Sequence, residues 1–173
     1  MSDAFVRFYE QNVLDVYGYL IYRVGARAEA ERLTQLTFER AAHHWRTLRS
    51  DPDGDRLRLF RIAREAASAR RPATDGDDPG LDPDLANALS KLDRSARSVI
   101  ALRWGANLAG PEIATVLGVT ENTVRRRLSR GLRRLRTELD NDGARSNPAG
   151  LGAGGGEREQ APAPRPGGGP RDA

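Results

Sequence analysis

The stretch GPEIATVLGVTENTVRRRL, residues 110–128, has the pattern of a helix-turn-helix. Pro111 suits the first turn of a helix, because its missing N–H needs no partner there. Gly118 stands where a left-handed helix end is required, and Thr120 can cap the helix that follows. Ala114 is small, as a close crossing of two helices demands. These local signals predict two helices that meet at a fixed angle.

The second of these helices is expected to bury one stripe and to expose arginines elsewhere. The expected buried stripe consists of Val124, Leu128, Leu132, Leu135 and Leu139. The other faces carry Arg125, Arg126, Arg127, Arg130, Arg133, Arg134 and Arg136, with no acid between Glu121 and Glu138. A helix in the major groove needs base readers near its N-terminus and cations near the phosphates.

The helix-turn-helix therefore predicts DNA binding, and its residues divide into two groups. Candidates at and near the start of the helix are Thr120, Glu121, Asn122, Thr123, Arg125 and Arg126, with Glu121, Asn122 and the two arginines favoured for base edges. Candidates for phosphate contacts are Arg127, Arg130, Arg133 and Arg134. The alternative is an amphipathic helix with a solvated arginine face, and the capped turn favours DNA binding over it.

Outward from this motif, the chain predicts an all-α fold of two small helical domains. Residues 1–71 have apolar residues at helical spacing, which predicts helices over about 5–24, 28–48 and 55–71 and a turn at 50–54. Residues 72–84 predict an acidic Pro/Gly linker, and residues 85–140 hold the helix-turn-helix domain, where Asp93 or Ser95 can cap a helix. Residues 141–173 predict a disordered Gly/Pro-rich tail.

Composition excludes several classes of function. The chain has 173 residues, a net charge of +4 and no Cys, so it has no disulfide framework and no thiol nucleophile. No apolar run could span a bilayer and no secretory signal is visible, which predicts a soluble cytoplasmic protein.

His43 and His44 are adjacent and do not share a helix face, so no metal site is expected. No catalytic motif or cofactor loop appears, so neither an enzyme nor a cofactor is expected. Trp45 and Trp104 are expected to anchor helix packing.

The second half of the chain resembles domain 4 of bacterial RNA polymerase sigma factors of the extracytoplasmic-function type. The resemblance lies in LSKLDRSARSVIALRW (89–104), in Glu112-Ile113-Ala114, in Leu117-Gly118-Val119 and in RRLSRGLRRL (126–135). It implies a domain that reads the −35 promoter element and docks on the flap of the polymerase β subunit.

The first half is similar to sigma domain 2 in a divergent form, so that the resemblance covers about residues 4–139. AERLTQLTF (30–38) is similar to the helix that clasps the β′ coiled coil, which implies a polymerase contact by Arg32, Gln35, Leu36, Phe38 and Glu39. LFRIAR (59–64) is similar to the helix that opens the −10 element, which implies DNA contacts by Arg58, Arg61 and Arg64, with Arg56, Arg70 and Arg71 as further backbone candidates. Arg32, Leu36 and Glu65 depart from the residues usual in the family.

Three functions remain open at this point. The first is a sigma factor that binds core RNA polymerase and promoter DNA, with an anti-sigma factor as a possible further partner. The second is a helix-turn-helix regulator that does not recruit polymerase. The third is a sigma-like protein that binds a partner without initiating transcription.

Overall fold

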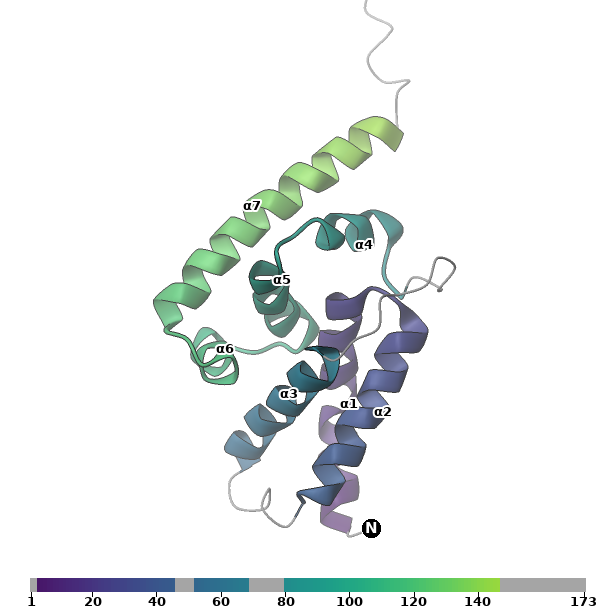
Figure 1. Ribbon diagram of the computed structural model, residues 1–173, viewed down its shortest axis with the longest axis vertical. Helices are drawn as coiled ribbons and strands as arrows, with labels where there is room; N and C mark the ends of the chain where they lie inside the picture. The colour runs from purple at the N-terminus through teal and green to yellow at the C-terminus, as the bar shows by residue number, and fades with distance from the viewer. Residues whose placement is uncertain (1–2, 46–51, 69–79, 147–173) are drawn as a thin grey trace, which may run out of the picture.

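Helices make up nearly all of the described chain (Figure 1). The structure is a computed structural model, and it describes residues 3–45, 52–68 and 80–146. The helices are α1 (Asp3–Val24), α2 (Arg27–His43), α3 (Pro52–Ser68), α4 (Pro83–Ser90), α5 (Arg94–Ile100), α6 (Gly110–Leu117) and α7 (Glu121–Ser146), with a π-helical turn η1 (Ala101–Gly105) after α5. These ranges contain no strand, and none of their helices is long and apolar enough to cross a membrane. The predicted all-α fold is confirmed.

Some helix ends differ from the sequence-based prediction. α3 begins at Pro52, inside the expected turn, because proline fits the first helical position and Asp53 and Asp55 favour the positive end of the helix dipole. α2 ends at His43, five residues earlier than expected. α7 continues to Ser146, into the segment expected to be tail.

The predicted linker is described only at its C-terminal end. There α4 begins at Pro83 because the Asp82 side chain accepts hydrogen bonds from the N–H groups of Asp84 and Leu85, at 3.0 and 3.1 Å. The remainder of the linker and the tail from 147 onward lie outside the described residues, as do Arg70 and Arg71.

Helices α1, α2 and α3 pack together as the first half of the molecule. Tyr19, Leu20, Leu33 and Phe60 are fully buried in their shared core. At the far end, the Trp45 ring lies 5.1 Å from the ring of Phe5 and 5.2 Å from that of Phe8. Trp45 therefore anchors helix packing as predicted. Trp104 does not, since it is 49% exposed.

Helices α4 to α7 form the second half, and α7 lies along its outer edge (Figure 1). Val124, Leu128 and Leu135 face the core as predicted, but Leu132 is 41% exposed and Leu139 is 36% exposed. The predicted stripe was wrong at these two positions. Gly131 is buried in place of Leu132, because α5 approaches so closely that a Cβ there would lie 2.9 Å from Cδ1 of Ile100.

The two halves share one hydrophobic core. Tyr19 and Phe60 of the first half belong to the same buried cluster as Leu102, Leu108 and Ile113 of the second. The closest approach joins α1 to η1, where a Cβ at Gly18 would overlap the Gly105 carbonyl oxygen, and a Cβ at Gly105 the Gly18 oxygen. Backbone touches backbone at this point. We call this packing of the two halves the closed arrangement.

Candidate nucleic-acid interface

The turn between α6 and α7 has the geometry that its sequence predicts. Gly118 adopts the left-handed conformation, with φ +66° and ψ +39°, and the N–H of Val119 donates to the Ala114 carbonyl at 3.0 Å. The Thr120 hydroxyl accepts from the N–H of Thr123 at 3.3 Å and so caps α7. The angle between the two helices is therefore set by local hydrogen bonds and by one glycine.

The first turns of α7 expose the predicted base-reading side chains. Glu121, Asn122, Arg125 and Arg126 are all exposed. A guanidinium N–H of Arg125 donates to Oδ1 of Asn122 at 3.1 Å, and one of Arg126 donates to Oγ1 of Thr123 at 3.4 Å. These contacts hold donors and acceptors in place on an outward face, as base-edge recognition requires.

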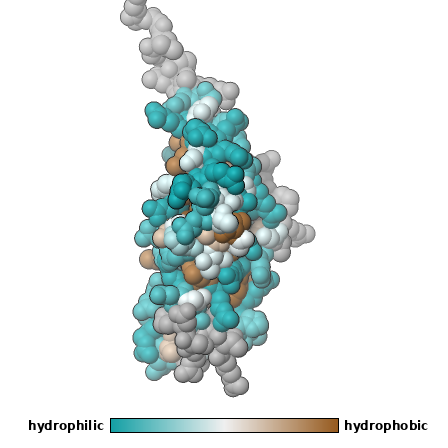
Figure 2. All heavy atoms as spheres, turned by 90° about the vertical axis from the view of Figure 1, so that its left-hand side faces the viewer, coloured by the Kyte–Doolittle hydropathy of each residue, from teal (hydrophilic) through white to brown (hydrophobic). Residues whose placement is uncertain are grey.

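The remaining arginines of α7 point in different directions. Figure 2 looks onto the side of the molecule that α6 and α7 occupy, and the surface there is mostly hydrophilic. Arg130 and Arg133 are exposed. Arg134 is also exposed, but it pairs at 2.7 Å with Glu138, a buried carboxylate that binds Lys91 at 3.1 Å as well. Arg127 is half-buried and turns toward the first half.

Asp93, at the start of α5, lies beside the arginine face of α7. Hydrogen bonds from the Ser95 hydroxyl and from the N–H of Ala96, at 2.6 and 2.9 Å, lower the pKa of the Asp93 carboxyl, and Arg130 lowers it further. Asp93 is thus the cap that the sequence predicts, and it remains ionised at neutral pH.

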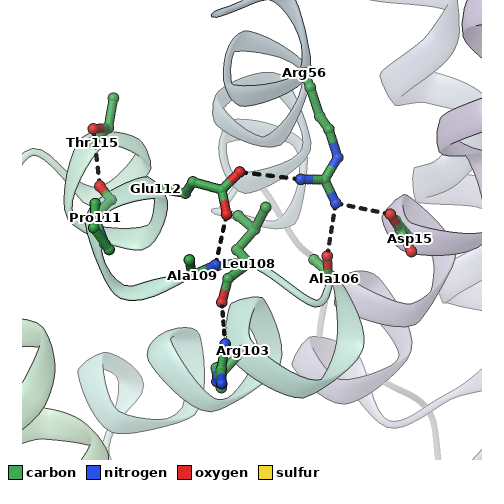
Figure 3. Close-up of polar contacts among 9 residues, drawn as sticks. All are labelled: Asp15, Arg56, Arg103, Ala106, Leu108, Ala109, Pro111, Glu112 and Thr115. Atoms are coloured by element: carbon green, nitrogen blue, oxygen red, sulfur yellow. Dashed lines mark hydrogen bonds and ion pairs between the residues drawn. The ribbon is translucent and has the colours of Figure 1, made fainter. Parts of the chain in front are cut away.

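Arg56 on α3 lies between the two halves rather than on an open surface (Figure 3). One of its terminal nitrogens donates to Oδ2 of Asp15 on α1 at 2.9 Å and to the Ala106 carbonyl at 3.1 Å, and the other donates to Oε1 of Glu112 on α6 at 3.3 Å. The other carboxylate oxygen of Glu112 accepts from the N–H of Ala109 at 2.6 Å. In the closed arrangement Arg56 therefore joins α1, α3 and α6 and is not available to DNA.

The three arginines of α3 that the resemblance assigns to DNA lie in three different settings. Arg61 is exposed, yet it donates to the Thr115 carbonyl on α6 at 3.0 Å. Arg58 is exposed. Arg64 is half-buried beside Arg127 in a cavity of about 530 Å³ between the halves, which we call the junction cavity. The structure thus brings Arg64 and Arg127, predicted for two different DNA elements, into one hollow.

An apolar groove of about 790 Å³ runs between α1 and α2. Three of the predicted polymerase-binding residues, Gln35, Phe38 and Glu39, line this groove. Gln35 donates to Glu39 at 2.8 Å. Leu36 packs against the core instead, and Arg32 is exposed and paired with Glu29 at 2.8 Å, which raises the pKa of Arg32 through the hydrogen bond and the carboxylate charge.

The sequence-based assignment missed the α1 side of this groove. Val6, Tyr9 and Leu14 are 41%, 42% and 79% exposed, and all three line the groove. A signal for them was present, because α1 carries apolar residues on more faces than one packed stripe needs. Large exposed apolar side chains that cluster in a groove are typical of a docking surface.

The described residues contain no group of three His, Asp or Glu side chains placed to hold a metal ion. Nδ1 of His43 lies 2.8 Å from the Glu39 carbonyl of its own helix, which is an ordinary helix-surface contact.

Comparison with known proteins finds similarity to sigma factors along both halves. Residues 88–137 match the family described as Sigma-70, region 4. The chain is 30% identical over 164 residues to the ECF RNA polymerase sigma factor BldN of Streptomyces coelicolor, an alignment that covers 82% of this chain and 62% of BldN. Along most of its length this chain is therefore similar to the extracytoplasmic-function (ECF) sigma factors. It is also 29% identical over 156 residues to the ECF sigma factor SigL of Mycobacterium tuberculosis, covering 78% of this chain and 88% of SigL.

A solved structure supports the fold of this chain. The sigma factor RpoE of Bartonella quintana, in complex with the anti-sigma factor NepR, superposes with a TM-score of 0.66 at 21% identity. The match covers 82% of this chain and 99% of RpoE, so it includes both helical halves. The architecture of α1–α3 followed by a helix-turn-helix half is therefore one that RpoE also has.

Proposed function

We propose that the chain binds core RNA polymerase and directs it to promoter DNA. The observation that carries this proposal is the capped α6–α7 unit, which presents Asn122, Arg125 and Arg126 outward on a helix start held by Gly118 and Thr120. Such a unit fits the major groove, with base readers first and cations after them. In this proposal α7 reads the −35 element and α3 reads the −10 element.

The DNA contacts of α7 follow from where its side chains lie. Glu121, Asn122, Arg125 and Arg126 are the base-edge candidates, with Thr120 and Thr123 beside them. Arg130 and Arg133 reach the flanking phosphates directly. Arg134 can do so while it also pairs with Glu138, because its side chain is 58% exposed.

The DNA contacts of α3 require the halves to separate. Arg58 is exposed already, but Arg61 donates to α6 and Arg64 lines the junction cavity. We propose that the closed arrangement is a resting form and that α3 becomes accessible when α6 leaves it. The exchange of Arg61 from the Thr115 carbonyl to a phosphate replaces a neutral acceptor by a charged one, which is the stronger partner.

The groove between α1 and α2 is the proposed polymerase contact. A partner helix with apolar side chains would cover Tyr9, Leu14 and Phe38, and polar groups at its edge would meet Gln35 and Glu39. The resemblance assigns this role to the β′ coiled coil and a further contact of the second half to the β flap. Arg32, at the edge of this surface and paired with Glu29, would make at most a rim contact.

The proposed activity makes and breaks no covalent bond. The chain contributes position and strand separation, and flipped bases exchange their stacking for protein contacts. Control by an anti-sigma factor is part of the proposal, since RpoE of B. quintana is held in a complex with one.

Transcription with purified components tests the proposal. Core RNA polymerase from S. coelicolor, the source of BldN, would be given this chain and a genomic DNA library, and the 5′ ends of the transcripts would be sequenced. A shared sequence upstream of the start sites is the expected result. DNA binding without initiation would indicate the helix-turn-helix regulator, and neither activity would indicate a partner-binding protein.

A matched pair of variants tests the groove separately. Leu14→Glu places a charge in the groove at a side chain that is 79% exposed, so the fold should be kept. It should lower polymerase binding at least tenfold while DNA binding by α7 is unchanged. Leu139→Glu makes the same chemical change outside the groove and should leave polymerase binding as it was. Equal loss in both variants would argue against the groove as the contact.

A further inference from the structure

The junction cavity is strongly basic. It has a volume of about 530 Å³ and is lined by four arginines, one carboxylate and three serines. Arg23 of α1 and Arg64 of α3 come from the first half, whereas Arg94 of α5 and Arg127 of α7 come from the second. The carboxylate is Glu65. The cavity exists only where the halves meet, so its charge belongs to the closed arrangement.

Partial burial strengthens the repulsion between these positive charges. Arg23 is only 9% exposed, and Arg64 and Arg127 are half-buried, so these guanidinium groups have lost much of their water. Like charges that converge from two packed surfaces oppose that packing unless an anion offsets them. Arg23 has polar contacts of its own, so the positive charge that faces the cavity comes mainly from Arg64, Arg94 and Arg127, beside the one lining carboxylate, Glu65.

Tyr19, which is fully buried on α1 and does not line the cavity, is exposed to the same positive potential. Burial raises the pKa of the Tyr19 hydroxyl, while Arg23, Arg64 and Arg94 all act to lower it. Three of the four cavity arginines thus direct their field at one buried point on α1.

The lining fits phosphate groups better than other small anions. Guanidinium groups bind phosphate oxygens in pairs, and four of them line this cavity. The volume lies within the range usual for small-molecule sites and exceeds what one phosphate fills. No aromatic side chain lines the cavity, so nothing there would stack on a base.

We propose that the junction cavity binds a small polyphosphate, a chain of two or more phosphates that is either inorganic or carried by a nucleoside, and that the bound anion holds the two halves together. Because the anion contacts arginines of both halves, it binds the closed arrangement and shifts the population toward it. The binding does not depend on the proposed function. Its effect on promoter DNA does, since Arg64 and Arg127 cannot hold polyphosphate and DNA at once.

Titration calorimetry on the full chain tests the binding. The probes are inorganic tripolyphosphate, ATP and sulfate at one fixed ionic strength. Saturable binding of one equivalent of tripolyphosphate is expected, with sulfate at least tenfold weaker. Similar affinity for tripolyphosphate and ATP would assign recognition to the phosphate chain, and much tighter ATP would assign a nucleotide as the natural source. Binding of duplex DNA alone, with neither small probe, would overturn the proposal.

Two charge-matched variants locate the site. Arg94→Gln removes a cavity arginine that is exposed at the start of α5 and is not among the predicted DNA contacts. It should weaken tripolyphosphate binding about tenfold. Arg136→Gln removes the same charge from the exposed far side of α7 and should change binding less than twofold. Equal affinities in the two variants would refute the site, provided that circular dichroism shows both to be folded.

A distance measurement tests the effect on the two halves. The chain has no Cys, so Arg40→Cys on α2 and Asp140→Cys on α7, both exposed, can be labelled selectively in one molecule. Tripolyphosphate should narrow the distribution of distances between the labels toward that of the closed arrangement. It should not do so when Arg94→Gln is added. Binding without any change in that distribution, in a sample that populates open forms, would overturn the second part of the proposal.

Discussion

Helices α3 and α7 both carry rows of arginine, and the structure uses the two rows differently. On α7, Arg125, Arg126 and Arg133 are exposed. Arg125 and Arg126 donate to Asn122 and Thr123 of the same helix. On α3, Arg56 and Arg61 reach across to the second half and bind its carboxylate and carbonyl groups. The same residue type thus presents a ready surface in one helix and holds an interface together in the other.

This difference shows that a row of arginines does not by itself define a nucleic-acid surface. What decides is which acceptors the tertiary fold brings within reach. Since α6 supplies both the Arg61 acceptor and Glu112, the helix that supports α7 also covers α3. The packing of the two halves therefore occupies Arg56 and Arg61 of α3, whereas it leaves Arg125, Arg126 and Arg133 of α7 exposed.

The largest expected effect comes from breaking the Gly18–Gly105 backbone contact, which holds the two halves together. Gly105→Ala places a methyl group against the Gly18 backbone, which cannot move aside as a side chain would. We expect the free energy of unfolding to fall by about 3 kcal/mol, as for severe overpacking. Chemical denaturation measures it, and Gly110→Ala, where a Cβ meets nothing within 4 Å, is the control. Equal midpoints for the two variants would contradict the packing described.

The next largest effect concerns DNA binding by the arginines of α7. Arg125→Ala should lower affinity for the preferred DNA site by about 1–3 kcal/mol and relax the preference at one base position. Arg133→Ala should weaken binding to all sequences alike and reduce the salt slope by about 1. Binding-site selection followed by salt titration measures both. Identical selection profiles for wild type and Arg125→Ala would remove that residue from base recognition.

A smaller effect tests the α3 row. Arg56→Ala leaves Asp15 and Glu112 without their shared cation in a site where Arg56 is 26% exposed. A loss of about 1–2 kcal/mol in unfolding free energy is expected, reduced at high salt because the site is only partly buried. Arg56→Lys keeps the charge but not the two-sided fork, so it should recover part of the loss. Thermal unfolding at low and high salt distinguishes these cases.

The smallest effect concerns the cap beside the α7 row. Asp93→Ala should cost about 1 kcal/mol at pH 7, as the loss of a helix cap usually does. Because the pKa of Asp93 is lowered in the folded chain, its contribution is present above the ordinary pKa of aspartate and is lost as the pH falls through the folded value. Asp93→Asn keeps a neutral cap, so its stability should depend less on pH in acid. Unfolding curves measured between pH 2 and pH 7 would show the difference. If the stability of Asp93→Asn and of the wild type changed equally with pH, ionisation of Asp93 would not be the cause.

Features that depend on neighbouring residues were predictable from the sequence. Gly118, Thr120 and Asp93 act through hydrogen bonds within a few residues of the chain, so their spacing alone identifies the turn and the caps. The order of the helices and the exposed start of α7 followed from the same signals. The family resemblance added the prediction that α3 and α7 contact different promoter elements.

Features that depend on distant residues were not predictable in this way. The Gly18–Gly105 contact and the Arg56 site join positions 40 or more residues apart, and nothing in either local sequence marks them. The error at Leu132 has a related cause, because a search for large apolar residues passes over Gly131, whose burial requires α5 to be close. The groove was found only in part, since the exposure of Leu14 depends on what α2 leaves uncovered.

The groove on α1 and α2 has a consequence for the chain without a partner. Val6, Tyr9 and Leu14 expose hydrophobic side chains to water. A second copy of the molecule can cover these side chains, as a helix of another protein can. Concentrated solutions should therefore contain reversible dimers, which dissolve on dilution or when a true binding partner occupies that surface.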